Sequence, residues 1–557
     1  MNAVETTLRA ADIIVYAGLV GLAVAFFWIV WSYAKGLKDS PRDMWILFTY
    51  KIIQYVAYAA MNPILILWLS KECGLGDIAA GNYIMAWSIL LSLVGMVSGA
   101  LVDTIGIKRT LIFSVIFLVI ARFFMSFVTH PVLIFFIGFV PFAIGFAMVA
   151  PVISVSIKRF TTKEGATLGF GLFYVIMNAA YAIGGWLIDY FRTVFVERDA
   201  AGKIINENFG TMLFGMHFST YQLLFILALA LTVLSVACIF FIRDGIEVEE
   251  ATDEQGKKSS KIVVKPSQDH GSGLAAIKSA FLTMYGRIKS AVSENYFWIF
   301  ILILTVTLFV RFIFFHLHYT FPKYGIRVLG EGAKIGNIYG VLNPALIIFL
   351  VPLFAAITKK WRSFTMLVVG SAISSLSCFI AVIPGVYFSG LTDSVLGEIV
   401  FIKWLGMAPD MPTLLANPPV PEYWSLIVFF TVFTIGEAIW SPRLMQFTAE
   451  IAPKGKEGTY IALAVLPFFL AKFVVGPMSG MLVNAYTPMV DKIDPATGAV
   501  VLDAAGKAVQ VVGDLSQHYM VWVWIGGMAI VTPIGLLLLH GIYKKHMEEK
   551  TEPAKAH

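Results

Sequence analysis

The segment Ser98–Leu111 reads "SGALVDTIGIKRTL" and lies between two apolar stretches, each of roughly 20 residues. It places the acid Asp103 and a basic pair that ends at Arg109 among two glycines, Gly99 and Gly106. Charge and glycine confined to so short a gap predict a tight loop that joins two membrane helices. The fold therefore depends on how many such apolar stretches the chain contains.

The whole chain has the composition of a membrane protein. Of its 557 residues, 58% are hydrophobic and 14% are charged, and the mean hydropathy is +0.80. A soluble domain carries about 25% charged residues. The sequence therefore predicts an all-α polytopic membrane protein, in a plasma membrane or a bacterial inner membrane. The formal net charge of +6 fits basic cytoplasmic loops and does not argue for a nucleic-acid partner.

Apolar stretches long enough to cross a bilayer recur along the chain. They predict about thirteen spans, at residues 11–34, 44–69, 80–102, 110–129, 131–157, 167–192, 218–242, 295–319, 332–357, 363–388, 424–447, 459–485 and 519–542. The first span has neither a basic start nor a small-residue cleavage site, which indicates an uncleaved anchor helix. The other twelve divide as six and six around a polar stretch.

This division predicts five parts: an anchor helix and loop at 1–43, a six-helix bundle at 44–243, a cytoplasmic linker at 244–294, a second six-helix bundle at 295–543 and a cytoplasmic tail at 544–557. The linker contains "EVEEATDEQGKKSSK", which has the composition of a disordered connection. It then contains "GLAAIKSAFLTMYGRIKSAVSENYF", whose helical apolar spacing predicts an amphipathic helix on the inner membrane face.

Lysine and arginine gather in loops that fall on one side of the membrane if the predicted spans alternate. That side is expected to be the cytoplasm, which places the N-terminus outside and the C-terminus inside. Two loops on the opposite side share the sequence "DAAGK", at Asp199–Lys203 and Asp503–Lys507. Each predicts a tight hairpin turn, and their matching positions fit two equivalent halves, although chance could also produce so short a match.

The opening segment fits the pattern G-x-L-x-D-x-x-G-x-K-R, formed here by Gly99, Leu101, Asp103, Gly106, Lys108 and Arg109. This pattern resembles the loop signature of the major facilitator superfamily, between the second and third helices of the first half. The resemblance implies two six-helix bundles that work by alternating access, with one extra N-terminal helix in this chain. It also implies that Gly99, Asp103, Gly106 and Arg109 form a conformational latch between the halves.

Three further stretches resemble the proton-coupled oligopeptide transporter (POT) family within that superfamily. They are "MNPILILWLSKECGLG" from Met61, "FYVIMNAAYAIGG" from Phe173 and "TIGEAIWSPRLMQFTAEIAPKGKEG" from Thr434. With the opening loop, they extend over most of the chain beyond the anchor helix. The resemblance implies transport of peptide-like solutes coupled to protons.

The chain departs from this family at the positions that carry its function. The family motif E-x-x-E-R aligns with Lys51, Gln54 and Tyr55, so both acids and the arginine are absent. The arginine that helps to hold a peptide carboxylate aligns with Asn62. The acid of the tenth helix remains, as Glu437. The resemblance therefore implies fold and transport more securely than it implies peptides or protons.

Four predicted spans carry an ionisable side chain several turns from either end: Lys51, Arg311, Glu437 and Lys472. Such a side chain is costly in a bilayer and usually faces a cavity or a partner. Three cations and one acid leave a positive surplus that an anionic or zwitterionic solute would balance. The alternative is an internal pair of Glu437 with Lys472 or Arg311 that only braces helices. Arg122 is placed similarly, but its long side chain could reach the interface.

The sequence thus provides a set of candidate site residues. Those for substrate binding are Lys51, Gln54, Tyr58, Asn178, Arg311, Asn343 and Lys472. Tyrosine and asparagine at such positions serve equally well to pack or hydrogen-bond helices. Glu437 is the candidate proton-coupling acid, with His316 as a second titratable group. A histidine beside aromatic residues near a span end is also typical of an interfacial belt.

These features predict a secondary transporter of a small anionic or zwitterionic solute, either peptide-like or an organic anion, with the proton as candidate coupling ion. The alternatives are a lipid or lysolipid flippase of the same fold and a uniporter or exchanger without proton coupling. The chain has no nucleotide-binding or hydrolase motif, so neither an enzyme nor a cofactor is expected. The three cysteines have no metal-site spacing, so no metal is expected. The protein is expected to be a monomer in the lipid bilayer.

Overall fold

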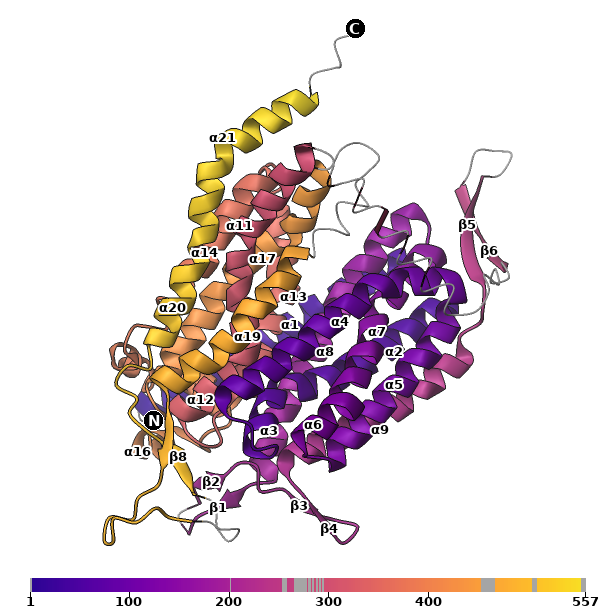
Figure 1. Cartoon of the computed structure of the whole chain (residues 1–557). Helices are drawn as coiled ribbons and strands as arrows, with labels where there is room; N and C mark the ends of the chain where they lie inside the picture. The colour runs from indigo at the N-terminus through magenta and orange to yellow at the C-terminus, as the bar shows by residue number, and fades with distance from the viewer. Residues whose placement is uncertain are drawn as a thin grey trace.

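A computed structural model describes residues 3–264 and 295–551, with gaps at 201, 253–257, 452–465 and 503–507, and scattered residues between 265 and 294. The described chain is built almost wholly of long helices in two bundles that stand side by side (Figure 1). The N-terminus and residues 195–219 lie at the lower end in Figure 1, and the C-terminus lies at the upper end. These names, lower end and upper end, are kept below.

Each bundle is one continuous part of the chain. The first consists of α2 (Arg42–Met61), η1 (Asn62–Ile64), α3 (Leu65–Lys71), α4 (Asp77–Ile105), α5 (Ile107–Phe127), α6 (Pro131–Ile134), η2 (Phe135–Phe139), α7 (Val140–Phe160), α8 (Lys163–Val194) and α9 (Thr220–Phe241). The second consists of α11 (Asn295–Tyr319), α12 (Phe321–Leu329), η3 (Gly336–Val341), α13 (Leu342–Ile357), α14 (Ser363–Ser377), α17 (Glu422–Ile451), α19 (Leu466–Tyr486), α20 (Met520–Ala529) and α21 (Val531–Thr551).

The predicted helical membrane fold is confirmed. Among the described residues, 11 helices are long and apolar enough to span a membrane, or 12 if the bent pair at 385–404 is one span. Every predicted span coincides with helical structure, although residues 459–465 lie outside the described part. The span predicted at 363–388 is shorter than expected, because α14 ends at Ser377 and irregular turns follow.

Two segments predicted as plain connections have structure of their own. Residues 389–423 contain α15 (Val395–Gly397), η5 (Glu398–Trp404) and α16 (Met411–Ala416), preceded by η4 (Gly385–Leu391). The polar start of the linker forms an antiparallel hairpin of β5 (Ile246–Thr252) and β6 (Lys258–Val264). Its strands alternate acids with Ile246 and Val248 in period two, a strand signal that the disordered-linker interpretation overlooked. The predicted amphipathic helix at 273–297 lies largely outside the described residues.

The first "DAAGK" segment joins β1 (Glu197–Arg198) to β2 (Ile204–Asn206), as the hairpin prediction requires. The second lies outside the described residues, but the flanking Leu502 and Ala508 form an antiparallel bridge. The remaining strands also pair as small hairpins at the lower end, β3 (Thr211–Leu213) with β4 (Met216–Phe218) and β7 (Met489–Asp491) with β8 (Gln510–Val512).

The loop that opened the sequence analysis forms the predicted turn between α4 and α5. Gly106 ends α4 with a φ of +86°, which a residue with a side chain rarely adopts, and α5 begins at the next residue. Lys108 Nζ donates to the carbonyl of Ile242 at 2.9 Å, which ties the loop to the end of α9. Arg109 is exposed. The side chain of Asp103 and the surroundings of Gly99 lie outside what the structure describes, so the latch remains a prediction.

The extra helix α1 (Ala3–Gly36) lies outside both bundles and contacts each of them. Near its C-terminal end, Tyr33 packs directly on Gly171 of α8, where a Cβ atom would meet the tyrosine ring. Near its other end, Asp12 forms an ion pair with Lys403 of η5. Most of its described apolar side chains, such as Phe27 and Trp28, are exposed and would face lipid. The two ends of α1 are thus held by different halves of the molecule.

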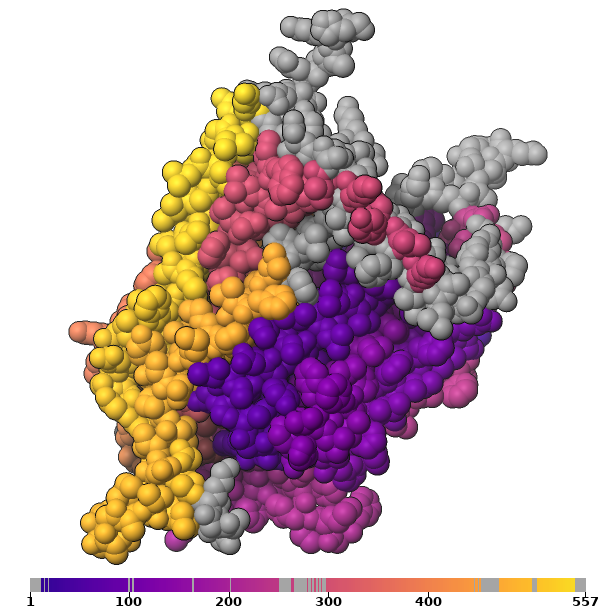
Figure 2. Space-filling view, in the orientation of Figure 1, coloured from indigo at the N-terminus to yellow at the C-terminus, as the bar shows by residue number. Residues whose placement is uncertain are grey.

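The two bundles meet through glycines, which allow helix backbones to approach closely. A Cβ atom on Gly185 of α8 would lie 2.6 Å from the carbonyl carbon of Gly340 and 2.7 Å from the oxygen of Gly336. On the other side, a Cβ on Gly81 of α4 would lie 2.4 Å from the oxygen of Gly476 in α19. Figure 2 shows the surfaces of α4 and α19 in contact along the boundary between the bundles.

We expect Gly185→Val to destabilise the protein by about 1–3 kcal/mol, because the valine must push α8 away from η3. Gly95→Val is the matched control, since no atom lies within 4 Å of a Cβ at that position of α4. Thermal unfolding of both purified variants would measure the effect. Equal melting temperatures would show that the glycine contact does not join the bundles.

Candidate functional site

The lower end is closed by ion pairs between the two bundles. Asp77, at the start of α4, accepts from Lys323 Nζ at 2.8 Å and from both terminal nitrogens of Arg327 at 2.8 and 2.9 Å, and both bases belong to α12. Burial lowers the pKa of Lys323 to about 8, against the opposing attraction of Asp77. Above that pH, Asp77 still pairs with Arg327, because a guanidinium remains protonated in proteins.

A second set of buried charges lies at the lower end of α8. Arg192 pairs with Asp189 at 3.1 Å and with Glu207, and it also donates to the carbonyl of Ala333 in the second bundle at 2.8 Å. Glu207 in turn accepts from the backbone N–H of Gly332 at 3.0 Å. These side chains are 0–2% exposed, so their charges must be met by other groups of the protein rather than by water, and Lys71 also pairs with Glu207 at 3.4 Å.

Asp189 also caps the first turn of η3. Its two carboxylate oxygens accept from the backbone N–H groups of Gly336 at 3.0 Å and Asn337 at 2.6 Å, and from the Asn337 side chain at 2.8 Å. The first N–H groups of a helix have no partner within it, so a carboxylate at that end is favourable. A side chain of the first bundle thus completes a helix of the second.

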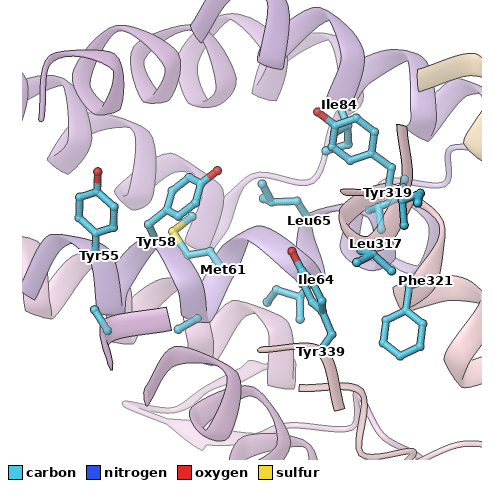
Figure 3. Close-up of a cluster of buried hydrophobic side chains, with 14 of the residues drawn as sticks. Tyr55, Tyr58, Met61, Ile64, Leu65, Ile84, Leu317, Tyr319, Phe321 and Tyr339 are labelled. Atoms are coloured by element: carbon cyan, nitrogen blue, oxygen red, sulfur yellow. The ribbon is translucent and has the colours of Figure 1, made fainter. Parts of the chain in front are cut away.

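Apolar side chains also meet between the two bundles. Figure 3 shows Ile64 and Leu65 of the first bundle in one buried cluster with Leu317, Phe321 and Tyr339 of the second. All five are buried. Together with the ion pairs, they close the lower end between the bundles.

A cavity of about 90 Å³ lies between the two bundles. Its wall is shared by α2, η1 and α8 on one side and by α11, η3, α13 and α17 on the other: Ala59, Asn62, Pro63, Tyr174, Met177, Asn178, Tyr181, Phe314, His318, Tyr339, Gly340, Asn343, Pro344 and Glu437. It is smaller than ordinary ligand pockets of about 300–1,000 Å³. A solute of dipeptide size therefore requires the bundles to move apart.

Glu437 is the one carboxylate that lines this cavity among the described residues. It accepts from Asn343 Nδ2 at 2.8 Å, and the same amide donates to Thr434 Oγ1 at 2.9 Å. Arg311 interacts electrostatically with Glu437, and its guanidinium lies 4.9 Å from the ring centre of Trp440. Because Arg311 precedes His318 by about two helical turns, both lie on the face of α11 that lines the cavity.

The histidine in the cavity wall is His318 rather than the predicted His316. The ring of His318 lies within hydrogen-bond distance of the Tyr339 hydroxyl, 2.8 Å from its Nδ1. His316 points elsewhere, is fully buried and pairs through Nδ1 with Thr320 Oγ1 at 2.7 Å. Helical periodicity separates the two faces, but the sequence alone does not show which face meets the cavity.

The structure brings together three of the predicted residues, Asn178, Asn343 and Glu437, with Arg311 beside them. Tyr58 does not line the cavity. Its ring is stacked on that of Phe146, with ring centres 3.9 Å apart, and lies 6.2 Å from the ring of Tyr181 in the cavity wall.

Three other candidates lie away from the cavity wall. Lys51 donates to the carbonyl of Phe173. Gln54 donates to Ser235 Oγ at 2.7 Å inside the first bundle. Lys472 of α19 donates to the carbonyl of Ser88 at 2.8 Å and thereby links the two bundles. The three cations of the predicted positive surplus, Lys51, Arg311 and Lys472, therefore have different partners.

The comparisons with known proteins agree with this architecture. The family model of the Major Facilitator Superfamily matches residues 47–474, which is most of the chain. The chain belongs to the Major Facilitator Superfamily. The match begins after α1, so the extra helix lies outside the common core of this superfamily. No curated protein matches the sequence.

Solved structures of POT family transporters share the fold of this superfamily member. One, a POT family transporter in complex with 5-aminolevulinic acid, is 14% identical, with a TM-score of 0.59 over 92% of this chain and 97% of the other. A second, the peptide transporter POT in a variant form with sulfate, is 16% identical, with a TM-score of 0.60 over 91% and 96%. A bacterial homologue of the human drug peptide transporters PepT1 and PepT2 is 13% identical, with a TM-score of 0.58 over 90% and 99%.

Several cavity residues were not among the candidates. Tyr181, Tyr339 and Met177 lack charge, so the search for ionisable groups in spans passed over them. Their signal is the aromatic content of α8 and η3, which is equally typical of helix packing. The Asp189–Arg192 pair was also missed, because its two charges lie near a span end, where they need no special explanation.

The ion pairs of the lower end make stability depend on pH. Burial opposes the ionisation of Glu207, but Arg192 and Lys71 outweigh it and hold the pKa of this carboxyl well below its usual 4.5. A lowered carboxyl pKa stabilises the folded, closed form above the ordinary value, and this contribution is lost progressively as the pH falls from 4.5 through the folded value of about 2. Glu207→Gln should therefore lower the melting temperature at pH 7 and have a progressively smaller effect at pH 4 and below.

The control is Glu197→Gln, which changes an exposed acid of β1 in the same loop. Its effect on the melting temperature should be small at every pH, since exposed charges contribute little. Thermal unfolding from pH 3 to 8 would test both variants. A loss that is the same at pH 3 and pH 7 for Glu207→Gln would exclude the ion pair as its cause.

Proposed function

We propose that this member of the superfamily is a secondary transporter of a small anionic or zwitterionic solute, either peptide-like or an organic anion. The observation that carries the proposal is the cavity shared by both bundles, where Glu437, Asn343 and Asn178 converge and Arg311 lies close by. Sites at the interface of two repeats are typical of transporters that work by alternating access.

The ion pairs at the lower end support a particular state of the transport cycle. If the N-terminus lies outside and the basic loops inside, as the charge distribution predicts, the lower end would face the exterior and this arrangement would be the state closed to the outside. The ion pairs of Asp77 with Lys323 and Arg327 would have to separate for the outward-facing state to form, as would the bonds from Asp189 and Arg192 to the backbone of the second bundle. A solute shifts this equilibrium only by binding the two states differently.

The charges near the cavity support the choice of solute. Arg311 provides a planar fork that can donate two parallel hydrogen bonds to a carboxylate or phosphate. Glu437 can accept from an amino group of the solute, with Asn343 holding its carboxylate in place. A cation and an anion on one face of the cavity suit a zwitterion. The neighbours' ligands, 5-aminolevulinic acid and sulfate, are the first compounds to test by thermal shift.

Glu437 is the proposed coupling acid, since it is the carboxylate of the cavity wall in the described chain. Glu437→Gln keeps the shape and the bond from Asn343 but cannot release a proton. We expect it to abolish accumulation driven by a proton gradient while exchange between preloaded compartments continues. Radiolabelled uptake into proteoliposomes would measure both activities.

The control for this experiment is Glu422→Gln, which changes an acid at the lower end of the same helix, α17. It should leave both activities near those of the wild type. If the Glu437→Gln protein still concentrates solute when the inside is alkaline, another group carries the proton.

Arg311 is the proposed anchor for the negative group of the solute. Arg311→Lys keeps the charge but loses the fork, so affinity should fall about tenfold, and Arg311→Ala should weaken it further. If Arg311 were only a structural partner of Glu437, Arg311→Ala would instead lower the melting temperature, and adding Glu437→Gln would restore it. Measuring affinity and melting temperature on the same proteins separates the two roles. Unchanged affinity in a stable Arg311→Ala protein would contradict the anchor.

A further inference from the structure

A second buried cation lies inside the first bundle, away from the solute cavity. Arg122 of α5 is 0% exposed, so its side chain does not reach the membrane interface as its position in the span allowed. Its guanidinium is enclosed by α2, α5, α7 and α9, and the ring of Phe142 lies 5.7 Å from it. A charge in so apolar a setting is costly unless a group of opposite sign accompanies it.

The neighbours of Arg122 provide hydrogen bonds but no negative charge. Its Nη1 donates to Gln54 Oε1 at 2.9 Å, to Thr232 Oγ1 and, at 3.5 Å, to the carbonyl of Ala228. The hydroxyl proton of Thr232 is already donated to Ala228 at 2.7 Å. In the part of the chain that the structure describes, no carboxylate pairs with Arg122. The only titratable group that interacts with it electrostatically there is the phenol of Tyr50, which carries no charge when protonated.

One edge of the guanidinium is left without acceptors. Nε and Nη2 of Arg122 are both buried and have no partner among the described atoms. These two nitrogens form the side edge of the planar group, the fork that binds anions through two parallel N–H bonds. Two unsatisfied donors thus occur side by side on an uncompensated positive charge.

We infer that the first bundle binds a small inorganic anion of the halide class, chloride in physiological media, on the free edge of Arg122. A halide accepts hydrogen bonds from several directions and offers no donor that would need an acceptor, which suits a site built from donors alone. A water molecule could accept the same bonds but would leave the charge unbalanced. A carboxylate or phosphate would need far more room inside a closed bundle.

This anion would have a structural role and does not depend on the proposed transport function. It would neutralise Arg122 at the point where Gln54 of α2 and Thr232 of α9 meet α5. Its binding would therefore stabilise the packing of these three helices. Because a ligand that binds only the folded state raises stability with its concentration, melting temperature should rise with chloride.

The test uses the purified full-length protein in detergent at constant ionic strength, with sodium gluconate replaced stepwise by sodium chloride or sodium bromide. The wild type should show a saturable rise in melting temperature with either halide. Arg122→Lys should weaken the apparent halide affinity about tenfold, because it keeps the charge and loses the fork. Arg122→Gln should show no halide dependence at all.

Two control variants separate this site from other effects of chloride. Arg42→Gln makes the same chemical change at an exposed position of α2 and should keep the full halide response. Arg311→Gln should also keep it, whereas a halide bound in the solute cavity would make that response disappear. An unaltered response in Arg122→Gln, or a wild type that does not respond, would overturn the proposal.

A direct measurement covers the case in which variants of Arg122 fail to fold. Crystals or grids of the wild type grown in bromide should show an anomalous or strong density peak within hydrogen-bond distance of Arg122 Nε and Nη2. If the density at this position in bromide were no stronger than that of a water molecule, or were absent, the anion site would be contradicted even if every variant were unstable.

Discussion

The closed end of this transporter depends on one constraint, which is that charges buried at the contact of the two bundles need partners inside the protein. The two acids Asp189 and Glu207 share Arg192, and the rest of their negative charge is met by Lys71 and by backbone N–H groups of the second half, including the first N–H groups of η3. Such a cluster is stable when complete and costly when one member is missing. This arrangement joins the end of α8 to the start of η3 across the contact between the two bundles.

Much of the fold was predictable because membrane spans leave a strong signal in composition. The turn at Gly106 followed from glycine and charge in a short gap, and its φ of +86° explains why glycine is there. The hairpin at Asp199–Lys203 followed from turn chemistry. What could not be predicted was the β5–β6 hairpin, whose alternating pattern is short and embedded in a polar segment, and the helical pieces within 389–423.

The sequence predicted at which level of the bilayer the candidate residues lie, but not which way their side chains face. Hydropathy places a residue at a level in the bilayer, and Glu437, Asn343 and Asn178 lie at the level expected for a central cavity. It does not tell which neighbour a helix face meets. Gln54 therefore turned out to bind Arg122 inside the first bundle. For the same reason, the histidine on the cavity wall is His318, which lies about half a helical turn from the expected His316.

Helix α1 is fastened at one end to η5 of the second half and at the other to α8 of the first. A straight rod attached to two bodies that rock against each other cannot keep both attachments. The pair of Asp12 and Lys403 is partly exposed, 42% and 33%, whereas Tyr33 is packed against backbone at Gly171. Because exposed ion pairs contribute little stability, the contact of α1 with Lys403 is the weaker of its two attachments. On the proposed mechanism, α1 would move together with the first bundle, and its ion pair with Lys403 of the second bundle would break during each cycle.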